Sequence, residues 1–216
     1  MPKITPSIFT CDTVSMINEI NDLKKAGIDW LHFDIMDGHF VPNYGLAPKQ
    51  LDDIKKHFPE IIIDAHVMAN DLEDKLVQLK NADYITFHLN SKQRFGFKNL
   101  IKKIKDMNCK VGLGMDLNNS IDDIKPYLED IDLITIMTIK PGFTGQKFEE
   151  SSWKTLKEVK QFCSLNFPNI KIQVDGGVRW DNIKKLIQNE IDLIVVGSLL
   201  FSEKDYSKTI KKIFSK

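Results

Sequence analysis

The feature that most constrains the fold is a repeated alternation of short apolar runs with longer amphipathic stretches. Eight runs rich in Ile and Val are typical of buried strands, and helical periodicity fills the intervals between them. The expected strands cover 3–8, 29–36, 60–68, 83–89, 109–115, 132–138, 170–175 and 191–197. Eight units in 216 residues average 216/8 = 27 residues, which is close to the minimum for a βα pair.

A second pattern marks every other strand. Four runs begin with an Asp between two apolar residues, at Asp29, Asp83, Asp132 and Asp192. The intervals are 83 − 29 = 54, 132 − 83 = 49 and 192 − 132 = 60 residues, or about two units each. We therefore expect residues 1–216 to form one domain, a closed parallel (β/α)8 TIM barrel. The alternative, an open doubly wound sheet, would favour a Gly-rich loop after the first strand, where Ser7 to Cys11 contains no glycine.

Composition limits the classes of binding partner and the compartment that we expect for this chain. Thirty Lys and Arg balance thirty Asp and Glu, and no basic stripe is interleaved with aromatics, which argues against nucleic acid and anionic membranes. No apolar run approaches the length of a bilayer span, and the first residues do not resemble a signal peptide. Cys11, Cys109 and Cys163 are odd in number and lack ligand spacing, which predicts reduced structural thiols and a cytoplasmic protein.

Polar residues recur on one face of the expected strands. Side chains alternate along a strand, and the neighbours of His32, Asp34 and Met36 are all apolar, so these three should point into the barrel. The same parity predicts further inward residues on five other strands: Thr5, Ser7, Asp64, His66, Met68, Thr86, His88, Thr135, Met137, Gln173 and Asp175. The polar ones gather toward the carboxyl ends of the strands, where barrel active sites lie.

Two His and two Asp of this set form a metal-ligand combination. Neutral imidazoles and carboxylates at His32, Asp34, His66 and Asp175 can hold one divalent cation. Zinc is the metal best suited to these donors, and iron(II), cobalt and manganese fit similar ones. Buried carboxylates need a cation, a proton or hydrogen bonds to persist, so a metal-free Asp–His network is the alternative.

Glycines follow the last three strands. They occur in the segment Lys140 to Gln146, at Gly176 and Gly177, and at Gly197 before Ser198. Glycine lets backbone N–H groups approach an anion, and a following helix would add its positive end. Because barrels often hold phosphate at the loops after strands seven and eight, these loops predict a phosphate site.

Several segments resemble ribulose-phosphate 3-epimerases, in order and across nearly the whole chain: DWLHFDIMDGHFVPN, DAHVM, ITFH, IMTIKPGFTGQKF, IQVDGGV and VGS. The resemblance implies a metal-dependent enzyme of the pentose phosphate pathway. It would interconvert D-ribulose 5-phosphate and D-xylulose 5-phosphate by proton transfer at C3 through a metal-stabilised enediolate.

The resemblance also implies roles for individual residues. The metal ligands would be His32, Asp34, His66 and Asp175, with Asp34 as proton acceptor and Asp175 as proton donor. The implied substrate contacts are Ser7, His66, Gly142, Phe143, Thr144, Gly145, Gly176, Gly177, Gly197 and Ser198. Relatives commonly associate, so a homo-oligomer is allowed.

The chain departs from the family pattern in places. Lys140 and Thr144 replace an Asn and a Gly of the sixth loop, Asn70-Asp71-Leu72 replaces a usual x-x-Pro, and GLGMDLNNSID stands where the family tends to have Asn-Pro-x-Thr. Three alternatives therefore stay open. They are an allulose-6-phosphate 3-epimerase acting on hexulose 6-phosphates, a non-catalytic phosphosugar-binding barrel, and a barrel lyase. A lyase would ordinarily need a lysine; Met36 takes the inner position, but Lys140 is available.

Overall fold

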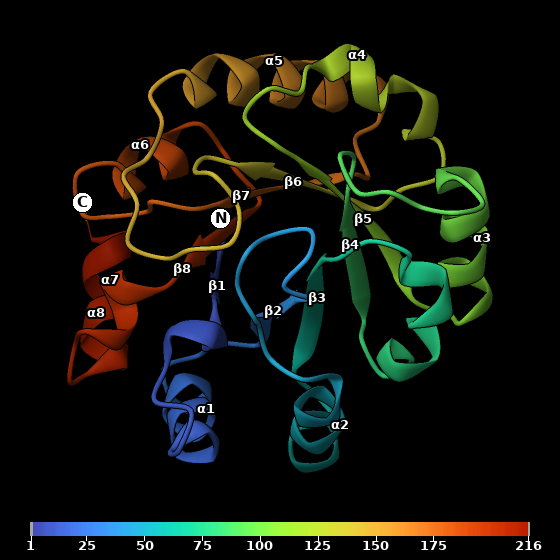
Figure 1. Ribbon diagram of the computed structural model, residues 1–216. Helices are drawn as coiled ribbons and strands as arrows, with labels where there is room; N and C mark the ends of the chain where they lie inside the picture. The colour runs from blue at the N-terminus through green and yellow to red at the C-terminus, as the bar shows by residue number, and fades with distance from the viewer. Residues whose placement is uncertain (1, 216) are drawn as a thin grey trace.

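The protein is a (β/α)8 barrel. The computed structural model describes residues 2–215, and Figure 1 shows the strands surrounded by helices. The strands are β1 (Lys3–Pro6), β2 (Trp30–Met36), β3 (Ile62–Met68), β4 (Tyr84–His88), β5 (Lys110–Met115), β6 (Leu133–Met137), β7 (Lys171–Asp175) and β8 (Leu193–Val196). All neighbouring strands are parallel, in the order β1-β8-β7-β6-β5-β4-β3-β2. Between β1 and β2 a single bridge from Ser7 to His32 closes the ring, so the predicted barrel is confirmed.

Helices of varied length connect the strands. The α-helices are α1 (Met16–Lys25), α2 (Pro48–His57), α3 (Phe97–Asp106), α4 (Ile121–Ile124), α5 (Ser152–Asn166), α6 (Ile183–Gln188), α7 (Ser198–Phe201) and α8 (Tyr206–Phe214). Short 3-10 turns occur at η1 (Ile8–Thr10), η2 (Leu72–Asp74), η3 (Leu76–Leu79) and η4 (Lys125–Tyr127). In α3 the apolar residues Leu100, Ile101 and Ile104 are buried while Lys98, Lys102 and Lys105 are exposed, as the periodicity predicts. No helix of residues 2–215 is both long enough and apolar enough to cross a bilayer.

The connection after β3 departs from the expected helix. Residues 69–83 contain only the turns η2 and η3. Asp71, which precedes η2, has a left-handed backbone with φ 47°. Leu72, Leu76 and Leu79 of these turns are buried in the main core, so short turns cover this side of the barrel in place of a helix.

The repeated Asp has a structural explanation at the amino ends of the strands. The Asp83 carboxylate accepts a hydrogen bond from the backbone N–H of Ile63 at 2.8 Å. Asp132 and Asp192 bind the backbones of β5 and β7 in the same way, at 2.9 Å each. Asp29 pairs instead with the side chain of Lys3. Each carboxylate thus ties its strand to the preceding one, so the strands are linked in the pairs β1–β2, β3–β4, β5–β6 and β7–β8.

The barrel interior is apolar at the bottom and polar above. Trp30, Tyr84, Leu133 and Leu193 form a buried cluster with one member from each even-numbered strand, the alternate-strand layering typical of these barrels. The outward residues of the same strands, such as Leu31 and Phe33, belong to the main core beneath the helices. The predicted parity is therefore correct, and the polar side chains lie in the upper barrel.

Candidate metal centre and substrate cavity

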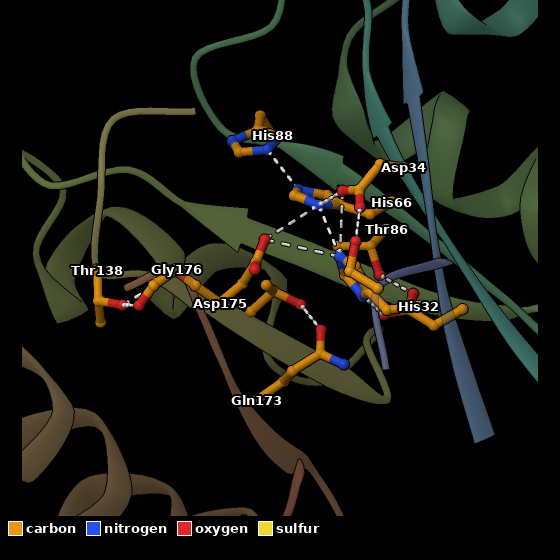
Figure 2. A network of polar contacts seen from close by, with 12 residues as sticks. His32, Asp34, His66, Thr86, His88, Thr138, Gln173, Asp175 and Gly176 are labelled. Atoms are coloured by element: carbon orange, nitrogen blue, oxygen red, sulfur yellow. Dashed lines mark hydrogen bonds and ion pairs between the residues drawn. The ribbon is translucent and has the colours of Figure 1, made fainter. Parts of the chain in front are cut away.

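Three strands bring the four candidate ligands together. Register places Asp34 of β2 beside His66 of β3, and β7 ends at Asp175. The donor atoms of His32, Asp34, His66 and Asp175 all lie within 4.8 Å of one another. In Figure 2 the carboxylates of Asp34 and Asp175 lie on opposite sides of the two imidazoles.

The spacing of the donors fits a small divalent cation. The two imidazole nitrogens, His32 Nε2 and His66 Nδ1, are 3.0 Å apart. They lie 3.4 and 3.2 Å from Asp34 Oδ1, and 3.6 and 3.4 Å from Asp175 Oδ2. A tetrahedral ion with bonds of about 2.0–2.1 Å requires neighbouring ligand atoms to be about 3.3–3.4 Å apart. The four groups could therefore bind a metal with little movement.

The outer nitrogens of both ligand imidazoles have buried polar partners. His32 Nδ1 lies 3.0 Å from Asp64 Oδ2, a buried carboxylate that also accepts from Thr86 Oγ1 at 2.7 Å. His66 Nε2 lies 2.7 Å from His88 Nε2. When these outer nitrogens carry the N–H groups, the inner nitrogens are acceptors that face two carboxylates. Such a convergence of acceptors calls for a cation, and the outer partners match the usual support of metal-binding histidines.

In the metal-free protein, a proton can balance the charges. Burial, the largest influence, disfavours the charged forms of both His32 and Asp34, but the opposite charges outweigh it. Attraction to Asp34 and Asp175 raises the pKa of His32 well above its usual range. Attraction to His32 and then His66 lowers the pKa of Asp34. Ser7 Oγ also donates to Asp34 Oδ2 at 2.6 Å, which further favours the ionised carboxylate.

A cavity opens above the cluster at the carboxyl ends of the strands. Nine of the ten predicted substrate contacts line it, together with Asp34 and Asp175: Ser7, Gly142, Phe143, Thr144, Gly145, Gly176, Gly177, Gly197 and Ser198. The tenth, His66, is fully buried beneath. Met36, Met68 and Met137 supply an apolar side of the cavity. No lysine of the described residues 2–215 lines it, and Lys140 lies outside.

Residues 3–201 match the family model described as the ribulose-phosphate 3 epimerase family. The chain belongs to this family. Among its relatives, the ribulose-phosphate 3-epimerase of Buchnera aphidicola subsp. Schizaphis graminum is 34% identical over 215 residues, which cover 99% of this chain and 93% of that protein. The ribulose-phosphate 3-epimerase of Bacillus subtilis (strain 168) is 31% identical, with coverage of 99% and 98%.

Solved structures support the fold of this epimerase-family chain. KGPDC from Streptococcus mutans superposes with a TM-score of 0.71 at 17% identity, over 100% of both chains. The 3-hexulose-6-phosphate synthase of Salmonella typhimurium gives 0.71 at 15% identity, over 98% of this chain and 96% of the other. At such identities the similarity concerns the barrel architecture alone.

Two adjacent glycines shape the loop after β7 in this member of the family. Gly176 has φ +114°, and a Cβ there would lie 2.3 Å from Ile139 Cγ1. Gly177 has φ +63°, and its Cβ would lie 2.4 Å from the backbone nitrogen of Phe148. Only glycine fits both positions, so the loop backbone can lie against the cavity.

The sequence predicts a helix after each glycine-containing loop, and this is correct without an intervening segment only for the loop after β8. Gly197 is directly followed by α7, whereas α6 begins at Ile183 and α5 at Ser152. Long connections separate these two helices from β7 and β6, and both connections line the cavity. Backbone amides of the loops, more than helix ends, are therefore the groups available to a phosphate.

Sequence reasoning missed two loop contacts at the cavity. Asn43 Nδ2 donates to the carbonyl of Gly142 at 2.7 Å and so links the second loop to the sixth. Arg179 lines the cavity, and its Nη2 donates to the carbonyl of Gly145 at 2.8 Å. The DGHFVPN motif contains Asn43, but Arg179 carries no local signal, since nothing in the sequence shows that the seventh loop reaches the sixth.

Sequence reasoning also gave no role to Asp64 and His88, the buried partners of two candidate ligands, or to Asp116, which contacts His88. Parity placed Asp64 and His88 inside the barrel without assigning them a function. Asp64 contacts His32, and His88 contacts His66. Asp116, one residue beyond β5, lies 2.8 Å from His88 Nδ1 and was not singled out.

Proposed function

We propose that the protein interconverts D-ribulose 5-phosphate and D-xylulose 5-phosphate by removing and returning a proton at C3. The observation that carries this proposal is the pair of carboxylates, Asp34 and Asp175, on opposite sides of the histidine pair and at the base of one cavity. The names of the relatives support the same reaction. Inversion at a carbon requires an acid and a base on its two faces, and this arrangement provides both.

Asp34 is the proposed proton acceptor. Its ionised form is favoured by the charge of His32 and the hydroxyl of Ser7, so it can act as a base near neutral pH. When it takes the C3 proton, the C–H electron pair forms the C2–C3 double bond and negative charge moves to the C2 oxygen. A bound divalent metal would act as a Lewis acid toward that charge.

Asp175 is the proposed proton donor. It lies on β7, which β1 and β8 separate from β2 around the barrel. In its protonated form it delivers a proton to the opposite face of C3, which completes the inversion. Asp34 is then protonated and Asp175 is ionised. A proton must then pass back between the two residues, directly or through solvent, before the next cycle.

The remaining residues of the cavity would hold the substrate. Backbone N–H groups of Gly176, Gly177, Gly197 and Ser198 are proposed to bind the phosphate. Gly142 to Gly145 would cover the sugar, and the three methionines would exclude water from the reacting carbon. Exclusion of water strengthens the electrostatic interactions on which the proton transfers depend.

Deuterium exchange in heavy water tests the two-carboxylate mechanism. With ribulose 5-phosphate, the wild-type protein should incorporate deuterium at C3 of both epimers, followed by NMR. Asp175→Asn should retain exchange into the starting epimer, because Asp34 still removes and returns a proton on one face, but should lose inversion. Asp34→Asn should lose both from the same epimer. Near-normal inversion by either variant would refute the assignment.

Substrate choice follows from the same assay. We expect ribulose 5-phosphate to exchange faster than hexulose 6-phosphates, and the reverse order would favour an allulose-6-phosphate epimerase. Cleavage of the sugar would point to a lyase, against which the absence of lysine from the described cavity lining already argues. Binding without exchange would leave a phosphosugar-binding barrel.

We propose zinc as the resident metal, held by the four clustered donors, with iron(II), cobalt or manganese as competitors. Elemental analysis of protein purified without added metal identifies it. We also propose that residues 1–216 act as one catalytic domain, which can associate with copies of itself. Cys11, Cys109 and Cys163 are free thiols, in keeping with a reducing cytoplasm.

A further inference from the structure

A chain of buried hydrogen bonds runs outward from the candidate ligand His66. His66 Nε2 lies 2.7 Å from His88 Nε2, and His88 Nδ1 lies 2.8 Å from Asp116 Oδ1. His66 and His88 are both fully buried, and the side chain of Asp116 is 15% exposed. Asp116 occupies the start of the turn after β5, where the sequence departs from the family pattern. Figure 2 shows the contact between the two imidazoles.

Contacts on its far side fix the orientation of the Asp116 carboxylate. Asn90 Nδ2 donates to Asp116 Oδ2 at 2.6 Å, which leaves Oδ1 directed at His88. The backbone nitrogen of Asp116 donates to Asn119 Oδ1 at 2.8 Å, and Asn119 Nδ2 donates to Asn90 Oδ1 at 3.3 Å. The carboxylate is therefore held in one position by two amide side chains.

The polarity of the chain follows from this carboxylate. An ionised carboxylate only accepts hydrogen bonds, so Nδ1 of His88 must carry the N–H. A neutral imidazole has one N–H, which makes Nε2 of His88 an acceptor. The facing Nε2 of His66 must then be the donor, and Nδ1 of His66 keeps its lone pair. That nitrogen lies 3.2 Å from Asp34 Oδ1 and 3.4 Å from Asp175 Oδ2.

Strand β5 is shaped to admit these groups. Its inward positions, paired with Thr86 and His88 of β4, are Gly112 and Gly114. A Cβ at Gly114 would lie 3.2 Å from Cγ and Nδ1 of the His88 ring, and one at Gly112 would lie 2.0 Å from Thr86 Oγ1. Because Gly112 and Gly114 have no side chains, His88 has room to lie between His66 and Asp116.

We propose that Asp116 is a positioning residue which, through His88, holds His66 in the tautomer whose Nδ1 lone pair points into the four-donor cluster. The proposal deepens the metal site of the proposed function and rests on it. Its test measures tautomer and metal binding rather than epimerisation, so the two can fail separately.

The first measurement is histidine NMR on the metal-free protein labelled with ¹⁵N-histidine. In the wild type we expect His66 to be protonated at Nε2 only. Asp116→Leu removes the acceptor and excludes a replacing water, so the two tautomers of His66 should become mixed. An unchanged single tautomer in the folded Asp116→Leu variant would overturn the proposal.

The second measurement is zinc affinity, determined on metal-free protein with a competing chelator. Loss of an outer partner typically weakens metal binding 10- to 100-fold, and Asp116 acts one residue further out, so we expect about tenfold for Asp116→Leu. Asp116→Asn retains an acceptor oxygen and should bind within about threefold of the wild type. The control Asp130→Leu removes an exposed carboxylate paired with Lys105 and should have no effect. Wild-type affinity in Asp116→Leu would contradict the proposal.

A double-mutant cycle separates positioning from general destabilisation. In a His88→Leu background the connection to His66 is already lost, so adding Asp116→Leu should not change zinc affinity further. If Asp116→Leu lowered zinc affinity as much in that background as in the wild type, Asp116 would act by another route and the proposal would be wrong. Circular dichroism of each metal-free variant establishes that the barrel is folded.

Discussion

Metal binding to the four-donor cluster should displace a proton from His32, and the affinity should therefore increase with pH. In the metal-free protein Asp34 and Asp175 raise the pKa of His32 well above 6.5, so the imidazole is protonated near neutral pH. The lowered pKa of Asp34 means that this carboxylate is already ionised and has no proton to release. One proton per metal should be released below the raised pKa of His32, and none above it.

The size of the effect can be worked out. One released proton gives a tenfold gain in affinity per pH unit, which is about 1.4 kcal/mol. Metal at about 100 to 1,000 times its Kd stabilises the fold by about 2.7–4.1 kcal/mol. For a chain of 216 residues each kcal/mol shifts Tm by about 2–4 °C, so metal removal should lower Tm by about 5–16 °C. At fixed excess metal, each pH unit should change the Tm difference between metal-bound and metal-free protein by about 3–6 °C, because the metal-free fold loses its protonated His32 as the pH rises.

Two assays check this prediction. Chelator competition between pH 6.5 and 8 gives the affinity, and a weakly buffered indicator dye counts the protons released on mixing zinc with metal-free protein. His57→Gln removes an exposed histidine at the end of α2 and should leave the count unchanged. An affinity independent of pH, or a proton count near zero in this range, would refute the reasoning about His32.

Three further results are expected. Arg179→Ala should raise KM for the ketose phosphate about tenfold, with kcat within about threefold, because a charged hydrogen bond to the sixth loop is lost. Steady-state kinetics measures both constants, and an unchanged KM would contradict this role of Arg179. Asp83→Ala removes the carboxylate that accepts the N–H of Ile63, so the free energy of unfolding in urea should fall by about 1–3 kcal/mol while activity stays unchanged. Equal stability of variant and wild type would contradict the strand-linking role. Burial raises the pKa of Cys11 to about 12 and of Cys163 to about 11, so both thiols should react with a disulfide reagent at pH 8 at least about 100-fold more slowly than in urea.

The sequence predicts the fold and the central donors because both depend on short periods. Alternation along β2 and β3 places His32, Asp34 and His66 inside, and the parallel register then places Asp34 beside His66. The carboxyl ends of parallel strands lie at one mouth, so Asp175 of β7 meets them there. Each step uses a property of the strand itself, and none requires knowledge of a loop.

Other contacts could not be predicted from the chain. Arg179 and Gly145 are 34 residues apart, and Asn43 and Gly142 are 99 apart, and they meet because loops fold over the barrel mouth. Loop paths have no sequence period, so these pairs are invisible to pattern analysis. Asp116 lies just outside a strand, where parity no longer determines direction.

The two ends of the barrel use aspartate for different purposes, and the difference lies in what surrounds the carboxylate. At the amino ends, Asp83 and Asp192 accept backbone N–H groups and lysine ammonium groups, with side chains 37% and 39% exposed. At the carboxyl ends, Asp34 and Asp175 are 9% and 15% exposed and face imidazole nitrogens. A carboxylate whose partners are fixed amides can only stabilise the fold. One whose partners can exchange a proton for a metal can also serve as a base, which is the role proposed for Asp34, while the repeated Asp at the amino ends stabilises the fold.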